Sequence, residues 1–123
     1  MHLNPNVRGP VHAELAGHER IRLLEPLHYL PLIWLMRRSY LVLTDSGGIQ
    51  EEAPTFGKPV LVMREVTERP EGIEAGCARL VGTSVAGILA GVRELFGNRA
   101  SYAAMAAVAN PYGDGRAAER IAE

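Results

Sequence analysis

The sequence predicts an α/β fold built on a doubly wound parallel sheet, with helices covering both faces of the sheet. Four short apolar runs are nearly continuous in Val, Leu or Ile instead of alternating, which is typical of strands buried on both faces. Segments with helical spacing separate these runs, and this alternation favours parallel strands joined by right-handed crossovers. The four expected strands are Ile21–Leu24, Tyr40–Thr44, Pro59–Met63 and Ala78–Val81.

Helices are expected where a capping or terminating residue adjoins a segment with apolar residues on one side. Gly17 is placed to end the first helix, and Pro31 lies in the first turn of the second, where a missing N–H costs little. Gly57 ends the third helix, while Ser84 and Gly97 bound the fourth. The expected helices are Val11–Ala16, Leu27–Ser39, Ile49–Phe56, Val85–Phe96, Ala100–Val108 and Arg116–Ala122.

Length and composition limit the classes of function. The 123 residues suffice for one small domain, and 47% apolar with 22% charged residues is ordinary for a soluble globular protein. A net charge of −1 gives no general attraction to nucleic acid or to acidic membranes, so any anion binding must be local. The four histidines and the single cysteine lack metal-ligand spacing. We therefore expect no metal and no cofactor. Because the pattern contains neither a signal peptide nor a membrane span, we expect a cytoplasmic location.

The segment Thr44–Pro54 carries the strongest functional signal. It passes from an apolar strand through a glycine turn directly into a helix, which is how many α/β proteins bind phosphate. Gly47 and Gly48 allow the backbone to approach a ligand, and the free N–H groups of the first helical turn favour an anion. Ser46 is expected to cap the helix or to contact a phosphate oxygen, and Glu52 suits the hydroxyls of a ribose. Taken alone, the pattern is equally consistent with a capped helix carrying solvated glutamates.

A charged loop follows the next expected strand. Ligands of doubly wound sheets bind beyond the carboxyl ends of the strands, so Arg64–Pro70 should face Asp45–Gly48 at that edge. The alternative is a solvated surface loop. An arginine facing a helix N-terminus would complete a diphosphate site, because its planar group offers several donors in a fixed arrangement. We favour Arg69 over Arg64 for this role, since Pro70 restricts the adjacent backbone.

These segments and several others, in their order along the chain, closely resemble the non-hydrolysing UDP-N-acetylglucosamine 2-epimerases. The likeness covers essentially all 123 residues. The motifs that carry it are Thr44–Pro54, Gly57–Arg64, Thr67–Glu71, His2–Val7, Tyr29–Pro31, Trp34–Met36 and Asn110–Gly115. The family has two Rossmann-like domains in a glycosyltransferase-B arrangement, with the active site between them. The resemblance implies that residues 1–123 form a single Rossmann-like domain, most of the second domain, without the first.

The family interconverts UDP-N-acetylglucosamine and UDP-N-acetylmannosamine. It eliminates UDP to form a glycal and then adds UDP back with C2 inverted. The resemblance therefore implies that this chain binds UDP or UDP-N-acetylglucosamine, that it needs no cofactor, and that the complete protein could form a homodimer. It also places the chain among enzymes of cell-envelope polysaccharide biosynthesis.

The resemblance assigns the binding residues one by one. It implies that Ser46, Gly47 and Gly48 contact the diphosphate, that Glu52 holds the ribose hydroxyls, and that Arg69 lies near the phosphate. These assignments agree with the physical interpretation of the same residues.

Three further positions follow from the resemblance alone. Leu27, through its backbone, and Leu32 would frame the uracil, although an aromatic ring commonly occupies the position of Leu32 in the family. His2 matches a residue near a regulatory nucleotide-sugar site. The acid and base carboxylates of the family lie in the first domain, so no residue of this chain is expected to be catalytic.

Two alternatives remain open at this stage. Retaining glycosyltransferases share the architecture, so the chain could belong to an enzyme that transfers the sugar instead of epimerising it. It could also be a non-catalytic remnant whose cleft face binds another protein.

Overall fold

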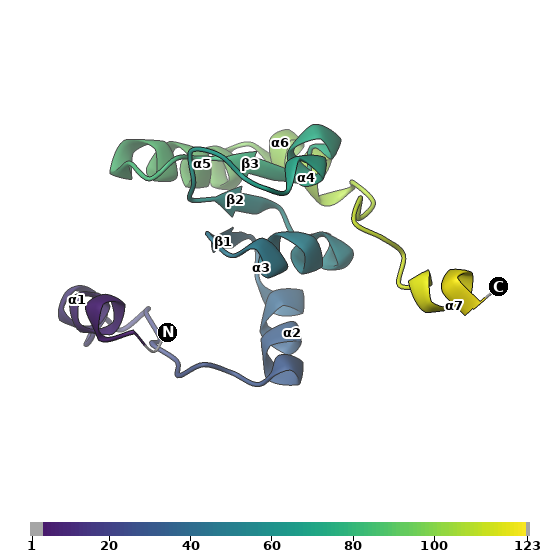
Figure 1. The fold of residues 1–123 in the computed structure, drawn as a ribbon. Coiled ribbons are helices and arrows are strands. Elements are labelled where there is room, and N and C mark those ends of the chain that lie inside the picture. The colour runs from purple at the N-terminus through teal and green to yellow at the C-terminus, as the bar shows by residue number, and fades with distance from the viewer. Residues whose placement is uncertain (1–3, 123) are drawn as a thin grey trace. The chain divides into compact units, whose positions relative to one another are not determined.

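The structure is a computed structural model that describes residues 4–122. The chain divides into two compact units, one up to Leu35 and the other from Met36 onward. Figure 1 labels the elements along the chain. They are α1 (Pro5–Leu15), α2 (Tyr29–Arg38), β1 (Val42–Thr44), α3 (Gly47–Glu52), the 3₁₀ helix η1 (Ala53–Phe56), β2 (Val60–Val62), α4 (Pro70–Ala75), β3 (Ala78–Leu80), α5 (Val85–Gly97), α6 (Arg99–Ala106) and α7 (Ala117–Ala122).

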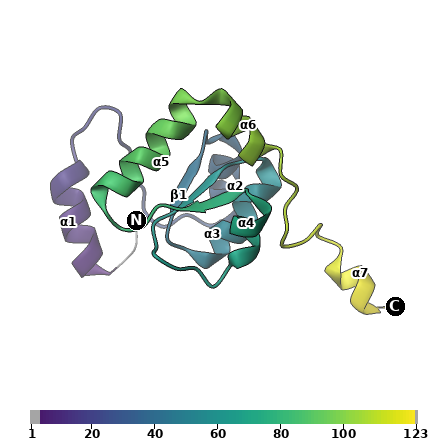
Figure 2. The same ribbon diagram turned by 90° about the horizontal axis from the view of Figure 1, so that it is seen from above.

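The second unit contains a parallel three-stranded sheet in the order β1-β2-β3. Val42 pairs with Val60, and Val60 pairs with Ala78, so the three strands are in step. Figure 2 shows α5 and α6 on one side of the strands, with α3 and α4 on the other. The prediction of a parallel sheet with helices on both faces is confirmed.

The core of this unit lies between the sheet and α5. All three residues of β2 are fully buried, and Leu61 packs with Leu95 and Met105. Helix α5 approaches closely because Gly91 has no side chain: a Cβ there would lie 2.7 Å from the Val81 side chain and 3.5 Å from Leu61. This packing explains why the central strand is apolar at every position.

The first unit contains α1 and most of α2. Helix α1 begins earlier than the predicted Val11, because the Asn4 side chain accepts a hydrogen bond from the Asn6 N–H at 3.0 Å and Pro5 fits the first helical position. It ends at Leu15, with Gly17 in a left-handed conformation at φ 85°. Helix α2 forms within the predicted Leu27–Ser39 but spans only Tyr29–Arg38, and Pro31 lies in its first turn.

The predicted strand at Ile21–Leu24 is wrong. This segment forms neither strand nor helix, and Ile21 and Leu24 are 37% and 43% exposed. A strand needs a neighbouring strand to satisfy its backbone groups, and the sheet of the described residues contains only β1, β2 and β3. An apolar run alone therefore did not suffice to form a strand here.

The other elements differ from prediction mainly at their ends. Helix α3 starts at Gly47 instead of Ile49, so both turn glycines lie in its first turn. Helix α4 was not predicted; it begins at Pro70 and ends before Gly76, which has a φ of 90°. Gly97 is the last residue of α5, and the side chain of Asn98 then caps α6 by accepting from the Ser101 N–H at 3.1 Å. Within residues 4–122, no helix combines the length and the apolar character needed to cross a membrane.

Candidate functional site

The turn after β1 leaves the first turn of α3 without a side-chain cap. Ser46 occupies the N-cap position, but its side chain makes no capping hydrogen bond. Its backbone N–H donates instead to the Thr44 hydroxyl at 3.0 Å, which tightens the turn. In the described part of the chain, the N–H groups of Gly47, Gly48 and Ile49 donate to no protein atom. These donors are therefore available to an anion, and the Ser46 side chain before them is exposed.

Helix α3 presents two different faces at this end of the sheet. Gly47 and Glu51 are four residues apart and therefore share one face, while Gly48 and Glu52 share the next. A Cβ on Gly47 would lie 3.2 Å from the Glu68 carboxylate and 3.7 Å from Arg69 Nη2, so the charged loop covers this face. A Cβ on Gly48 would have no atom within 4 Å, so the second face is open.

Arg69 lies against the covered face, as the sequence predicted for the loop after β2. Its Nε donates to Glu51 in an ion pair, and its Nη1 donates to the backbone oxygen of Glu68 at 3.2 Å. Among the described residues, Nη2 has no hydrogen-bond partner and lies nearest Gly47. The hydrogen bond to Glu51 raises the pKa of the Arg69 guanidinium, which keeps this charge fixed beside the helix N-terminus.

Arg64 is directed to a different partner. It forms an ion pair with Glu68, four residues later in the same loop. Hydrogen bonding to the backbone, followed by the charges of Arg64 and Arg69, lowers the pKa of the Glu68 carboxyl. The loop thus brings one ion pair and one further arginine to the carboxyl ends of β1 and β2.

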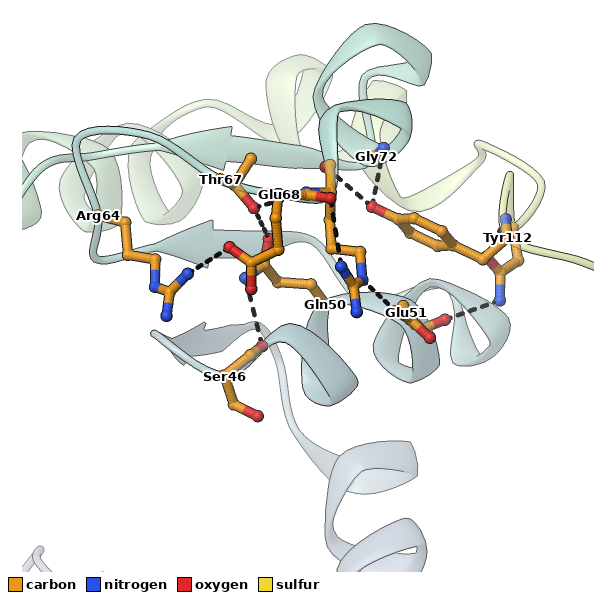
Figure 3. Close-up of polar contacts among 10 residues, drawn as sticks. Ser46, Gln50, Glu51, Arg64, Thr67, Glu68, Gly72 and Tyr112 are labelled. Atoms are coloured by element: carbon orange, nitrogen blue, oxygen red, sulfur yellow. Dashed lines mark hydrogen bonds and ion pairs between the residues drawn. The ribbon is translucent and has the colours of Figure 1, made fainter.

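A buried polar contact connects this loop to α3. Gln50 is fully buried; its Nε2 donates to the Ser46 carbonyl at 3.3 Å, and its Oε1 accepts from the Thr67 hydroxyl at 2.8 Å. The same Thr67 hydroxyl accepts from the Arg69 N–H at 3.1 Å. Figure 3 shows Gln50 of α3 meeting Thr67 of the loop next to Glu68. Because buried polar groups are costly to leave unpaired, this contact fixes the loop relative to the glycine turn.

Glu52 ends α3 on the open face, one helical turn after Gly48. One carboxylate oxygen, Oε2, is buried and has no hydrogen-bond partner among the described residues. An unpaired buried acceptor typically costs about 1–3 kcal/mol. A ligand hydroxyl that donates to Oε2 would therefore relieve this cost.

The remaining predicted residues lie elsewhere. Leu27 and Leu32 belong to the first unit, where Leu27 is exposed and Leu32 is half-buried in α2. His2 lies outside the described residues. Among residues 4–122, no group of three or more His, Cys, Asp or Glu side chains is arranged to hold a metal ion.

Sequence reasoning missed several residues that build the site. Glu51 forms an ion pair with Arg69, which the sequence pattern did not predict. Gln50, Thr67, Asn110 and Tyr112 lie within the motifs of the resemblance, but the sequence predicts no individual role for them. The burial of Gln50, which marks a polar residue that needs a specific partner, is visible only in the structure.

Comparison with known proteins identifies the family. The sequence model described as UDP-N-acetylglucosamine 2-epimerase matches residues 1–123. A probable UDP-N-acetylglucosamine 2-epimerase from Ralstonia nicotianae is 57% identical over 121 residues, which are 98% of this chain and 32% of that protein. This chain therefore spans about a third of the length of such relatives.

Solved structures agree with this match. The S. aureus MnaA–UDP structure superimposes with a TM-score of 0.96 at 50% identity, covering 99% of this chain and 33% of the other. The UDP-GlcNAc 2-epimerase from Neisseria meningitidis, bound to UDP-GlcNAc, gives a TM-score of 0.95 at 48% identity, covering 98% and 33%. The predicted α/β fold, as part of a glycosyltransferase-B type architecture, is confirmed by these superpositions. The chain belongs to the UDP-N-acetylglucosamine 2-epimerase family.

Proposed function

We propose that this chain is the UDP-binding portion of a UDP-N-acetylglucosamine 2-epimerase, a single Rossmann-like part of its second domain. The observation that carries the proposal is the buried, unpaired Oε2 of Glu52, one helical turn from the open backbone at Gly48. A nucleoside diphosphate carries an anionic group and a pair of neighbouring ribose hydroxyls. The uncapped helix end and the carboxylate complement these two groups in turn.

The diphosphate would lie against the first turn of α3. The N–H groups of Gly47 and Gly48 and the Ser46 hydroxyl would donate to its oxygens, and Arg69 Nη2 would approach from the side of Gly47. The helix dipole adds about 0.3–1 kcal/mol for an anion at this end. Hydrogen bonds that involve a charged group are stronger than neutral ones, so Arg69 should add more than either glycine.

The ribose would occupy the open face of α3. Its hydroxyls can donate to Glu52, which satisfies the buried oxygen and selects a sugar with two neighbouring hydroxyls. We also propose that Leu27 and Leu32 contact the uracil. Because Leu32 replaces the aromatic ring common in the family, the base should bind more weakly, by about 1–3 kcal/mol by analogy with base stacking.

We propose that this chain does not turn over substrate alone. The glutamates that could serve as a base at the diphosphate, Glu51 and Glu68, are each paired with an arginine. Abstraction of the C2 proton requires a base within hydrogen-bond reach of the sugar, not of the nucleotide. The role of these residues would instead be to hold UDP as it leaves and returns. The match to the epimerase family over the whole chain favours this function over glycosyl transfer.

The decisive measurement is calorimetric titration of UDP into the wild-type chain and a Glu52→Gln variant. Glutamine preserves the size of the side chain but replaces a charge-assisted hydrogen bond with a neutral one, so we expect affinity to fall about tenfold, or about 1.4 kcal/mol. Glu74→Gln is the matched control, because it removes the same charge from an exposed position on α4. Equal UDP affinity in all three proteins would refute the proposed site.

A further inference from the structure

The hydroxyl of Tyr112 lies between two backbone groups at the start of α4. It donates to the Arg69 carbonyl oxygen at 3.1 Å and accepts from the Gly72 N–H at 2.9 Å. Figure 3 shows the Tyr112 ring reaching from the loop after α6 toward Gly72. Tyr112 follows Arg69 by 43 residues, so this contact connects the site to a distant part of the chain.

The fit between Tyr112 and α4 is tight. A Cβ on Gly72 would lie 2.6 Å from the Tyr112 hydroxyl and 3.4 Å from its ring, so any larger residue at position 72 would displace the tyrosine. Burial raises the pKa of the Tyr112 hydroxyl, which therefore keeps its proton and continues to donate to Arg69. The backbone of Arg69 is thus held by a specific, permanently available donor.

The same loop also holds the partner of Arg69. The Asn110 side-chain nitrogen donates to the Glu51 carbonyl oxygen at 2.9 Å and to the Thr55 hydroxyl at 2.6 Å. The Asn110 side-chain oxygen accepts from the Tyr112 N–H at 3.0 Å, which couples the two contacts. One short loop therefore fixes both residues of the Glu51–Arg69 ion pair, one from α3 and one from the loop before α4.

We propose that Tyr112 is a positioning residue for nucleotide binding: by holding the Arg69 backbone, with Asn110 holding Glu51, it directs the free Nη2 of Arg69 toward the diphosphate. This inference rests on the proposed function, because it requires Arg69 to contact the diphosphate. With Nε committed to Glu51 and Nη1 to the Glu68 carbonyl, a small rotation of the backbone at Arg69 would redirect the only nitrogen left for a ligand.

Tyr112→Phe tests the inference, and Tyr102→Phe is its matched control. Both substitutions remove a hydroxyl that donates to a backbone carbonyl, since Tyr102 donates to the Tyr40 oxygen at 2.8 Å. Tyr102 stacks on Tyr40, at a ring separation of 4.2 Å, and makes no contact with Arg69 or Glu51. Tyr112→Phe should lose somewhat more stability than Tyr102→Phe, because the Tyr112 hydroxyl also accepts from the Gly72 N–H, but only Tyr112→Phe should change ligand binding.

The binding measurement compares UDP with uridine, which has no phosphate. We expect Tyr112→Phe to weaken UDP about fivefold and to leave uridine unchanged, because only the diphosphate contacts Arg69. Tyr102→Phe should leave both affinities unchanged. If Tyr112→Phe weakened UDP and uridine by the same factor, or if Tyr102→Phe reproduced its effect on UDP, the tyrosine would have a merely structural role and the inference would fail.

A second readout does not depend on UDP. The Arg69 Nε–H signal in NMR spectra should exchange faster with solvent in Tyr112→Phe, because the ion pair with Glu51 loses its support, and should be unaffected in Tyr102→Phe. An unchanged Arg69 signal in Tyr112→Phe would overturn the inference even if UDP binds. A wild-type chain that binds no UDP, with the Arg69 signal altered as expected, would instead refute the proposed function and with it the role in nucleotide binding.

Discussion

Helices α3 and α5 begin in nearly the same way, yet they use the same residue types for different purposes. Each follows a strand through a short turn, with a serine at the N-cap in extended backbone: φ −84° and ψ 129° at Ser46, φ −79° and ψ 144° at Ser84. Ser84 caps its helix by accepting from the Gly87 N–H at 3.1 Å. The Ser46 side chain caps nothing. The start of α5 is capped by its own serine side chain, whereas the start of α3 leaves its backbone N–H groups available to a ligand.

The glycines of the two helix starts also differ, in whether neighbouring protein atoms surround them. A Cβ on Gly87 would lie 2.4 Å from the Val81 carbonyl oxygen, so this glycine permits close packing of α5 on the end of β3. A Cβ on Gly48 would have open space around it. The comparison indicates that a glycine with no neighbour and a serine with no capping role are better evidence for a binding site than either residue type alone.

The largest effect should come from exchanging glycine for alanine at the two positions. Gly87→Ala forces a methyl group onto the Val81 carbonyl, and such overpacking typically costs about 1–3 kcal/mol in the free energy of unfolding. Gly48→Ala should leave stability unchanged or raise it by up to about 1 kcal/mol, because alanine is the better helix former. Urea denaturation of both variants measures the difference.

The same pair separates stability from binding. Gly48→Ala should weaken UDP, since its methyl group would occupy the space through which the diphosphate approaches the backbone. The contrast between the two helix starts would be lost if Gly48→Ala destabilised the chain as much as Gly87→Ala. It would also be lost if Gly48→Ala bound UDP as tightly as the wild type.

A smaller effect is expected from the two serines. Ser84→Ala removes a cap and should cost about 1 kcal/mol of stability without changing UDP affinity. Ser46→Ala removes no cap, so stability should change by less than about 0.5 kcal/mol. UDP affinity should nevertheless fall about fivefold, because one hydroxyl donor to the diphosphate is gone. Denaturation and titration of both variants check this reversal, and a loss of stability in Ser46→Ala like that in Ser84→Ala would show that both serines cap.

The sequence predicted the sheet of the second unit, because buried parallel strands depend on local patterns, while the place of the site stays a prediction. Continuous apolar runs identified β1, β2 and β3, and the glycine turn identified the helix start. The choice of Arg69 over Arg64 as the arginine facing that start agrees with the position of its Nη2 near Gly47, while the role of Arg69 in binding stays a proposal.

The features that sequence reasoning missed depend on contacts between distant residues. The Ile21–Leu24 run resembled the other strands, but it lacks a neighbouring strand in the described chain. Tyr112 and Asn110 contact residues 40 to 59 positions earlier, and no local pattern specifies such pairs. The orphaned oxygen of Glu52 is likewise a property of three-dimensional burial, which a carboxylate at a given helix position does not reveal.

The smallest expected effect concerns pH and the charges of α5. The hydrogen bond from the Ser101 hydroxyl, followed by the nearby Arg79, lowers the pKa of the Glu94 carboxyl. The folded state therefore binds this proton less readily than the unfolded state. The resulting stabilisation is fully present above the unfolded pKa and is lost as the pH falls through the folded pKa. The Glu94 side chain is 43% exposed, so solvent screening keeps the contribution small.

Glu94→Gln should accordingly lose less stability than the wild type when the urea midpoint is measured at about pH 6 and then at about pH 3. Glu74→Gln, which removes the same charge from an exposed position on α4, should follow the wild type. Because Glu94 lies on α5 and its partners are all protein groups, its protonation should change folding while UDP affinity at a fixed pH stays the same in the variant. A Glu94→Gln variant with altered UDP affinity would mean that the C-terminal end of α5 is coupled to the site at the start of α3 instead of independent of it.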